Sequence, residues 1–294
     1  ITTLTGAAAD LNTAYDSAGI SGLANEAVTL SDTTLAASVL NTLDGHTSGT
    51  IDASSINTLT GSAADLITAY ASGGITGLGD EAVNVSSGTA STSQATTLAA
   101  ATSGIVTVTI SDGDLTTLDG LTETDNAYSI TVSDGSVDAA ALNTLDGKTT
   151  VIVDASSVTT LTGAAADLNT AYAANGSSIT GLGNEAATLS DTTLAAAVLN
   201  TLDGNTSGTI DASNITTLTG SASDLITAYT SSGITGLANE AVTLSDTTLA
   251  VSVLNTLDGH TSGTIDAGTV TTLTGAAADL NTAYDSAGIS NLGN

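Results

Sequence analysis

Five amino acids are missing from this chain of 294 residues, which contains no Met, Cys, Pro, Phe or Trp. Without cysteine, the chain can form neither a disulfide scaffold nor a thiolate metal site. Six Tyr are the only aromatic residues, so we expect a core built from aliphatic side chains. The sequence begins at Ile1 without an initiator Met, and we therefore expect it to be a segment of a longer or processed polypeptide.

Positive charge is almost absent as well. Lys148 is the only Lys or Arg against 30 acidic residues, which gives a net charge of -29. Nucleic acids and anionic membranes are bound through basic side chains, so we expect neither as a partner. No apolar run approaches the ~20 residues of a membrane helix, and no membrane insertion is expected. Hydrophobic residues still make up 41% of the chain, which predicts a folded protein and not a disordered acidic tail.

A long sequence unit occurs several times along the chain. The phrase Ile-Thr-Thr-Leu-Thr-Gly, or a close variant of it, starts near residues 1, 56, 158, 215 and 270, and residues 86–147 contain a variant insertion. Repeats of this length are typical of solenoids, in which each unit packs only against its neighbours. Residues 270–294 repeat residues 1–25 with three substitutions, so neither end has a distinct capping sequence. We predict a single solenoid array over residues 1–294 that continues in a longer or polymerising chain.

Short β-branched runs alternate with short helical patterns. The predicted strands are residues 28–31, 50–53, 105–111, 129–133, 150–154, 188–190, 209–212, 243–245 and 264–267. Between them, apolar residues such as Leu40 and Leu43 are spaced as on one face of a helix. We expect Asp32 to cap this helix and Gly45 to end it in a left-handed conformation.

Two further helix starts are indicated by Ser62-x-x-Asp65 and Ser221-x-x-Asp224, which resemble capping boxes with Asp in place of Glu. A strand, a turn, a short helix and a return loop make one coil, and coils stacked ~4.8 Å apart form a parallel sheet. We predict an α/β solenoid of stacked strand–short-helix coils with a parallel sheet. The alternative is an all-β parallel β-helix, because Leu-Asn-Thr-Leu-Asp-Gly is short enough to be a helical turn or a strand with a corner.

Histidine, lysine and tyrosine offer little for catalysis. His46 and His260 occupy the same place in their repeats, where other copies have Asn205 or Lys148, and this variation predicts a solvated, dispensable loop position. Five of the six Tyr share the context Thr-Ala-Tyr, which predicts packing at a helix end with the hydroxyl in water. The acidic pairs recur in every unit, as expected for structural residues. The sequence therefore predicts no catalytic residue and no enzyme.

Aspartate outnumbers glutamate five to one, which is typical of turns, caps and ion ligation. If coils stack in register, Asp112 and Asp134 occupy one column, Asp154 lies diagonally beside them, and Asp114 is close by. Like charges ~4.8 Å apart repel, and a single Lys with no Arg cannot offset this. Carboxylate oxygens are the ligands that Ca²⁺ selects, so these four residues are the candidate calcium ligands. Solvated turn and cap aspartates are the alternative, and no other cofactor is expected.

Several phrases carry a resemblance to known repeats. They are Val28-Thr-Leu-Ser-Asp-Thr-Thr-Leu, Val39-Leu-Asn-Thr-Leu-Asp-Gly, Ile75-Thr-Gly-Leu-Gly-Asp-Glu-Ala and Leu161-Thr-Gly-Ala-Ala-Ala-Asp-Leu-Asn-Thr-Ala-Tyr. Nearly the whole chain resembles repeat arrays in giant acidic surface or extracellular proteins of marine bacteria, cyanobacteria especially. The resemblance implies an extracellular or cell-surface structural role and no catalytic residue.

Two functions remain open after these observations. The first is a structural filament, sheath or surface stalk that extends by end-to-end stacking of solenoids of the same kind. The second is the spacer of a large adhesin, rigidified by calcium, whose binding domain lies outside this segment. An ice- or carbohydrate-binding face would need threonine rows at equivalent strand positions, and an enzyme would need a cluster of acidic and basic residues that is not repeated.

Overall fold

The computed structural model describes residues 1–293 of the chain. The helices are α1 (Ala8–Asp16), α2 (Ala37–His46), α3 (Ala63–Ala71), α4 (Thr92–Ala101), α5 (Leu115–Leu118), α6 (Ala139–Asp146), α7 (Ala165–Ala174), α8 (Ala196–Asn205), α9 (Ala222–Thr230), α10 (Val251–Asp258) and α11 (Ala277–Asp285). The chain divides into two compact units, a first of residues 1–133 and 144–154 and a second of residues 134–143 and 155–294. The prediction of a single array stays a prediction.

The strands are short and fall before and after the helices. They are β1 (Thr3–Gly6), β2 (Ala27–Leu30), β3 (Thr34–Ala36), β4 (Ile51–Asp52), β5 (Thr58–Gly61), β6 (Ile75–Thr76), β7 (Ala82–Val85), β8 (Val106–Thr109), β9 (Ala127–Ser129), β10 (Ser136–Asp138), β11 (Val153–Asp154), β12 (Thr160–Gly163), β13 (Ile179–Thr180), β14 (Ala186–Leu189), β15 (Thr193–Ala195), β16 (Ile210–Asp211), β17 (Thr217–Gly220), β18 (Ile234–Thr235), β19 (Ala241–Leu244), β20 (Thr248–Ala250), β21 (Ile265–Asp266), β22 (Thr272–Thr274) and β23 (Ile289–Ser290).

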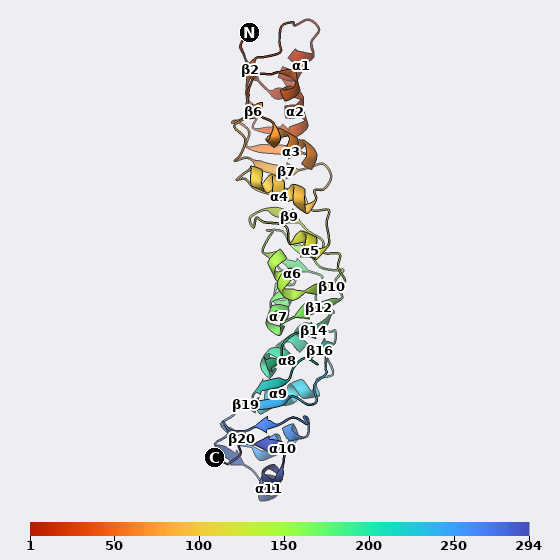
Figure 1. Cartoon of the computed structure of the whole chain (residues 1–294), viewed down its shortest axis with the longest axis vertical. Helices are drawn as coiled ribbons and strands as arrows, with labels where there is room; N and C mark the ends of the chain where they lie inside the picture. Colours follow the sequence, from red (N-terminus) through yellow and green to blue (C-terminus); the bar gives the residue numbers. More distant parts are fainter. Residues whose placement is uncertain (294) are drawn as a thin grey trace. The chain divides into compact units, whose positions relative to one another are not determined.

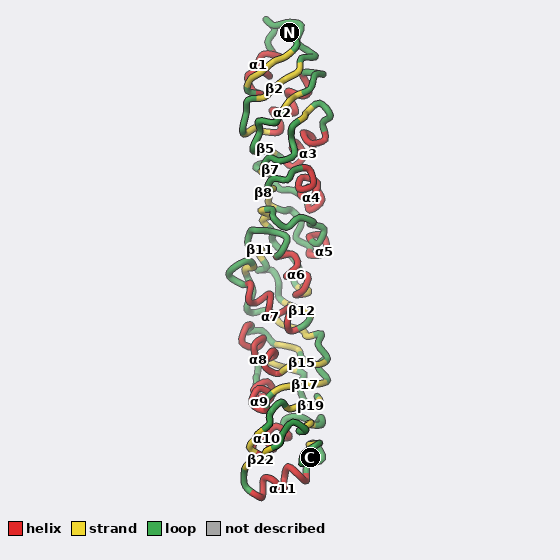
Figure 2. The backbone as a smooth tube through the Cα atoms, turned by 90° about the vertical axis from the view of Figure 1, so that its left-hand side faces the viewer, coloured by secondary structure: helices red, strands yellow, loops and turns green. Residues whose placement is uncertain are grey.

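Parallel ladders and stacked helices confirm the α/β solenoid-like repeat fold. In the first unit the ladders have the order β1-β2-β4-β6 and β3-β5-β7-β8-β9, and helices α1 to α4 follow one another beside them (Figure 1). In the second unit the order is β10-β12-β14-β16-β18, β15-β17-β19-β21-β23 and β20-β22. Figure 2 shows β15, β17 and β19 side by side in this unit. Each coil therefore contributes its strands to neighbouring coils on either side.

Strands and helices repeat with different spacings. Strand partners in the first ladder keep a nearly constant separation along the chain, as the pairs Thr3–Ala27, Val28–Ile51 and Ile51–Ile75 show. The starts of helices α1 to α4 are farther apart than these partners, as their bounds show. Because the strand step is shorter than the helix step, the strands of one ladder change position relative to the helices from coil to coil. Each ladder therefore begins just before one helix and ends just after a later one. In the first unit β1 precedes α1 and β6 follows α3, and a second ladder starts at β3 before the first has ended.

The core is aliphatic, as expected. Leu40 and Leu43 of α2 are fully buried, and so is Leu59 of β5. Val83 and Val106 continue the buried column on the next two strands. The phrase Leu-Asn-Thr-Leu-Asp-Gly forms part of helix α2, so the all-β alternative is wrong. Replacing one such leucine by alanine typically costs about 2–5 kcal/mol, so these layers are the main source of stability.

Several local predictions are corrected. The Thr-Leu-Thr-Gly phrases are absent from the predicted strands, yet they form β1, β5, β12 and β17 and most of the fifth copy forms β22. Gly45 lies inside helix α2 and is not among the residues with positive φ, so the predicted left-handed end is wrong. The predicted capping serines are confirmed: Ser62 Oγ accepts the backbone N–H of Asp65 at 3.1 Å. The Asp65 carboxylate accepts from the Ser62 hydroxyl at 2.7 Å, which differs from a complete capping box.

Candidate functional site

Buried glutamates form the most regular polar feature of the structure. Four of them are at most 1% exposed, and each lies beside a tyrosine from the preceding helix and a threonine from the following coil. The four groups are Glu26 with Tyr15 and Thr47, Glu81 with Tyr70 and Thr102, Glu185 with Tyr172 and Thr206, and Glu240 with Tyr229 and Thr261. We call each group a Glu–Tyr–Thr cluster.

The cluster at Glu240 shows how the parts are joined. The carboxylate accepts the backbone N–H of Ala238 at 2.9 Å and the hydroxyl of Tyr229 at 3.1 Å. The backbone carbonyl of Glu240 accepts the Thr261 hydroxyl at 2.9 Å. A buried carboxylate is costly unless it is hydrogen-bonded, and these donors offset that cost. The cluster therefore ties a helix, a turn and the next coil together without any basic residue.

A glycine follows each of these threonines and packs on the same glutamate backbone. A Cβ added at Gly208 would lie 2.1 Å from the carbonyl oxygen of Glu185, and one added at Gly263 would lie 2.1 Å from that of Glu240. Atoms do not approach this closely, so only glycine fits here. Gly49 and Gly104 have the same close approach to their own glutamates. The Thr-Ser-Gly phrase of the repeats is therefore a contact with the preceding coil.

Proton affinities reflect this burial. Burial raises the pKa of the Tyr172 hydroxyl to about 12, and the nearby Glu185 carboxylate adds to the rise. The pKa of the Tyr229 hydroxyl is raised for the same two reasons. Burial also raises the pKa of the Glu26 carboxyl, but hydrogen bonds from backbone N–H groups and from Tyr15 outweigh it and hold that pKa below its usual value. A neutral tyrosine that donates to a charged glutamate is the stable arrangement.

Four aspartates cap helices of the preceding coil. The Asp32 carboxylate accepts the N–H of Ala8 at 2.8 Å, at the start of α1, although we predicted that Asp32 caps α2. The same bond joins Asp112 to Thr92 at 2.7 Å, and equivalent bonds join Asp191 to Ala165 and Asp246 to Ala222. Helix α1 has no cap from its own Ala7 side chain, so the neighbouring coil supplies it. A cap of this kind typically contributes about 1 kcal/mol.

The four predicted calcium ligands have been placed by the structure as follows. Asp112 caps α4, and Asp114 caps α5 by accepting the N–H of Thr117 at 3.0 Å. Asp154 ends strand β11 in the first unit, whereas Asp134 is the first residue of the second unit. Within residues 1–293, no three Asp, Glu, His or Cys side chains lie together in a way that could hold a metal ion.

The strand register also differs from the one behind the calcium prediction. A column with Asp112 over Asp134 would require Ile110 to pair with Val132. The ladder instead pairs Val108 with Tyr128 and Thr109 with Ser129, so its step along the chain is shorter than in the regular repeats. The next bridge joins Thr131 to Asp154. The shared column of Asp112 and Asp134 is therefore wrong, and calcium binding itself stays a prediction.

The histidine position is not a free loop, which corrects the prediction. His46 ends helix α2, and its ring stacks on Tyr15 with centroids 5.4 Å apart. The His46 Nε2 atom also lies 3.5 Å from an Asp16 carboxylate oxygen. Lys148, at the same place in its repeat, donates from Nζ to the carbonyl of Leu121 at 2.6 Å. Their dispensability for folding stays a prediction.

The tyrosine prediction is half correct. Tyr15, Tyr70 and Tyr229 do pack at helix ends, but their hydroxyls donate to buried glutamates and do not point into water. The sequence carried a signal for this pairing, since Glu follows Tyr by eleven residues in these three copies. Tyr284 is different, because it is 58% exposed.

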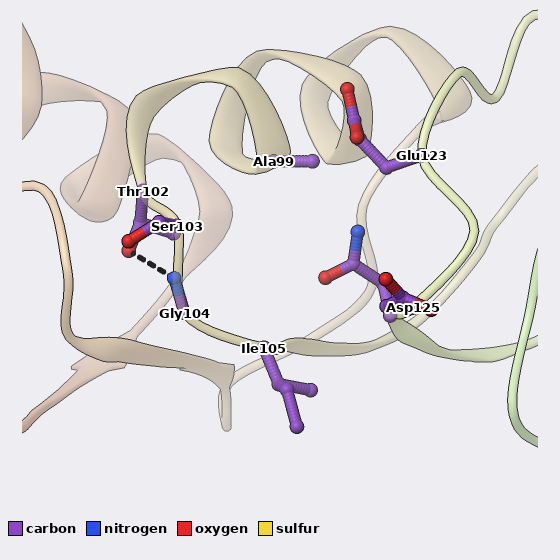
Figure 3. A pocket seen from close by; sticks show the side chains of 8 residues that line it. Ala99, Thr102, Ser103, Gly104, Ile105, Glu123 and Asp125 are labelled. Carbon is purple, nitrogen blue, oxygen red and sulfur yellow. Dashed lines mark hydrogen bonds between the residues drawn. The ribbon is translucent and has the colours of Figure 1, made fainter.

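One pocket belongs to the variant coil, and Figure 3 shows its lining. Ala99 on helix α4 faces Glu123 across the pocket, while the Ile105 side chain points away from both. The Thr102 hydroxyl oxygen accepts the N–H of Gly104 at 3.0 Å, so the adjoining turn is the same Thr-Ser-Gly turn as in the regular repeats. Asp125 and Glu123 are exposed carboxylates, and no basic residue is among those that line the pocket. The pocket therefore does not pair a carboxylate with a basic side chain, as many catalytic sites do.

Acid should weaken the turns that follow the short strands. The hydroxyl of Ser213, and then its backbone N–H, hold the pKa of the Asp211 carboxyl below its usual value. A lowered folded pKa contributes stability above the unfolded pKa, and this contribution is lost as the pH falls through the folded pKa. We expect the stability difference between the wild type and Asp211→Ala to be present at about pH 6 and to shrink below about pH 4. Urea unfolding at both pH values measures it, and a difference that does not change with pH would contradict the expectation.

Comparisons with known proteins return no relative: no protein-family model matches the chain, and neither does any curated protein or solved structure. Among residues 1–293, no helix is both long and apolar enough to cross a membrane. The repeated contacts described above join each coil to its neighbours.

Proposed function

We propose that this chain is a non-enzymatic structural repeat protein that forms an extracellular or cell-surface filament, sheath or stalk by end-to-end stacking of coils. One observation carries the proposal: the same contacts join neighbouring coils again and again along the chain. Parallel strand pairs such as Thr3–Ala27 and Thr58–Ala82 recur, and so do the Glu–Tyr–Thr clusters.

A further coil would cover apolar side chains of the first and last coils among the described residues. In the first coil, Ile20 is 48% exposed, although the equivalent Ile75 is 8% exposed. In the last coil, Leu280 is half-buried, although the equivalent Leu225 is fully buried. Strands β1 and β23 each pair with a single neighbour among the described residues, but so do the internal ladder ends β3, β6 and β18. The exposed apolar side chains are therefore what favours addition of a further coil here.

A second copy of the chain suits these surfaces. The two terminal coils differ from each other in what they leave uncovered, so the contact would be head-to-tail. Each coil already stacks by parallel strand pairing, and a head-to-tail copy would continue the same ladder. A net charge of -29 opposes association until salt screens it or divalent cations bridge it. Calcium is the candidate cation.

The test is association of the chain across a salt series. The Debye length falls from ~30 Å at 0.01 M to ~3 Å at 1 M, so we expect monomers at low salt and end-to-end oligomers in high salt with Ca²⁺. Light scattering and negative-stain microscopy measure the change. Ile20→Asp should block association because it puts a charge on the terminal surface. Ile105→Asp is the matched control, since Ile105 is 56% exposed but lies on an internal coil.

Other outcomes decide against the proposal. A particle that stays monomeric under every condition would favour the spacer of a large adhesin, in which further coils of one chain cover these surfaces. Equal association of Ile20→Asp and Ile105→Asp would show that the terminal coils are not the contact.

A further inference from the structure

One position in the repeats decides whether a tyrosine face is covered. It comes just before the threonine that donates to the buried glutamate, and it is occupied by His46, Ala101, Asn205 and His260 in the four clusters. The four positions are equivalent because the next residue makes the same hydrogen bond in each cluster. That residue is Thr47, Thr102, Thr206 or Thr261, and its hydroxyl donates to the backbone carbonyl of the buried glutamate. His46, Ala101 and His260 lie beside Tyr15, Tyr70 and Tyr229. The Asn205 side chain instead donates to Asn169 Oδ1 at 2.9 Å.

In two of the clusters an imidazole ring covers the tyrosine. His46 stacks on Tyr15 with the ring planes 3° apart, and His260 stacks on Tyr229 at a centroid distance of 5.9 Å, also 3° apart. Parallel rings at such distances are in the range of favourable aromatic contacts. In both clusters, therefore, an imidazole ring occupies the position against the tyrosine face.

At Tyr70 the ring is missing. Ala101 replaces histidine, and a pocket of about 230 Å³ opens between helices α3 and α4. Its lining is Ile67, Tyr70, Ala71, Thr97, Leu98 and Ala101. Helices α9 and α10 provide the closest comparison, because Ile226, Tyr229, Thr256 and Leu257 repeat four of these six residues and His260 stands in the fifth place. The pocket therefore includes the place that the histidine ring fills in the other two clusters.

The chemistry of the pocket selects for an uncharged ring. The Tyr70 hydroxyl is tied to Glu81, so the orientation of its ring is fixed. Ala71 stands where Asp16 meets His46, so none of the six lining residues offers a carboxylate to a cation. The remaining walls are aliphatic, apart from Thr97, whose hydroxyl donates to the Ser93 carbonyl at 2.8 Å.

We propose that this pocket binds a free small molecule through one uncharged, planar aromatic ring, stacked on Tyr70 as the imidazoles of His46 and His260 stack on their tyrosines. The inference does not depend on end-to-end assembly, since all six lining residues belong to the first unit. It assigns a ligand class to the variant part of the array. A site of this size with one anchoring ring binds weakly, with a Kd in the millimolar range.

The probes are 4-methylimidazole, kept neutral above its pKa, and phenol. Tyrosine ring signals in NMR spectra of the full chain report binding, and we expect the Tyr70 signals to shift with saturation. Ala101→His should fill the pocket from within and weaken binding at Tyr70 by at least about tenfold. His260→Ala should create a second site and add shifts at Tyr229. Both residues occur at this position in the chain, so both variants should fold, which circular dichroism checks.

Two results would overturn the proposal. The first is an absence of saturable shifts at Tyr70 in the wild type with either probe. The second is binding at Tyr70 that Ala101→His leaves unchanged, because the ring would then occupy some other place. Cyclohexanol is the matched control ligand: binding as tight as that of phenol would show an unspecific apolar groove and not a stacking site.

Discussion

Gly208→Ala is expected to lower the free energy of unfolding of its coils by about 3 kcal/mol or more. The new Cβ would lie 2.1 Å from the Glu185 carbonyl oxygen and 2.9 Å from the Ala186 nitrogen, and neither backbone atom is free to move alone. To relieve the clash, the turn would have to lift away from Glu185, which breaks the bond from Thr206 to that carbonyl. Hydrogen exchange of the amides in these coils, together with urea unfolding, measures the loss.

Gly204→Ala is the matched control. Gly204 lies near the end of helix α8, and a Cβ there meets no atom within 4 Å. Alanine should stabilise this helix by about 0.5–1 kcal/mol, because glycine loses more backbone freedom on folding. Equal effects of the two variants would mean that the Thr-Ser-Gly contact is not tight in solution.

Glu240→Ala should cost about 2–4 kcal/mol, the second large effect. The variant leaves the N–H of Ala238 and the hydroxyl of Tyr229 without their acceptor in a buried place. It also leaves a cavity, which adds to the loss. Since repeat arrays unfold locally, the effect should be largest in amides of the coils around residues 229–261, as hydrogen exchange resolves.

The neighbour Asn239 provides the control for this variant. Asn239 is exposed, and Asn239→Ala should change stability by less than about 0.5 kcal/mol. A Glu240→Ala protein as stable as Asn239→Ala would contradict this expectation. It would show that the free energy lost by burying the carboxylate equals the free energy gained from its hydrogen bonds.

The fold class could be predicted because the repeats are near identity and the apolar periodicity changes from two to nearly four within each unit. The strands at Thr3–Gly6 and Thr58–Gly61 could not, because each has a single leucine flanked by threonine and glycine. Their pairing depends on neighbours a full coil away along the chain, which a local pattern does not reveal. Tertiary context therefore decided these strands.

The polar contacts were harder to predict than the fold. Asp32 precedes a helical pattern, and local rules assign it to that helix, yet it caps the helix of the preceding coil. The partner of Glu26 is a tyrosine near the end of the preceding helix, and the Thr47 contact comes from the following coil. Such spacings follow from the length of a coil, which the strand ladders define and local sequence patterns do not.

The difference between strand and helix spacing has a mechanical consequence. Because a new ladder begins before the old one ends, the last strand of one ladder lies in a coil whose other strand belongs to the next ladder. In the second unit, β18 ends its ladder while β19 of the same coil is in the middle of another. If the backbone hydrogen bonds of one ladder break in sequence, the break reaches a coil that a second, intact ladder still holds. Resistance to a pulling force is therefore shared among coils.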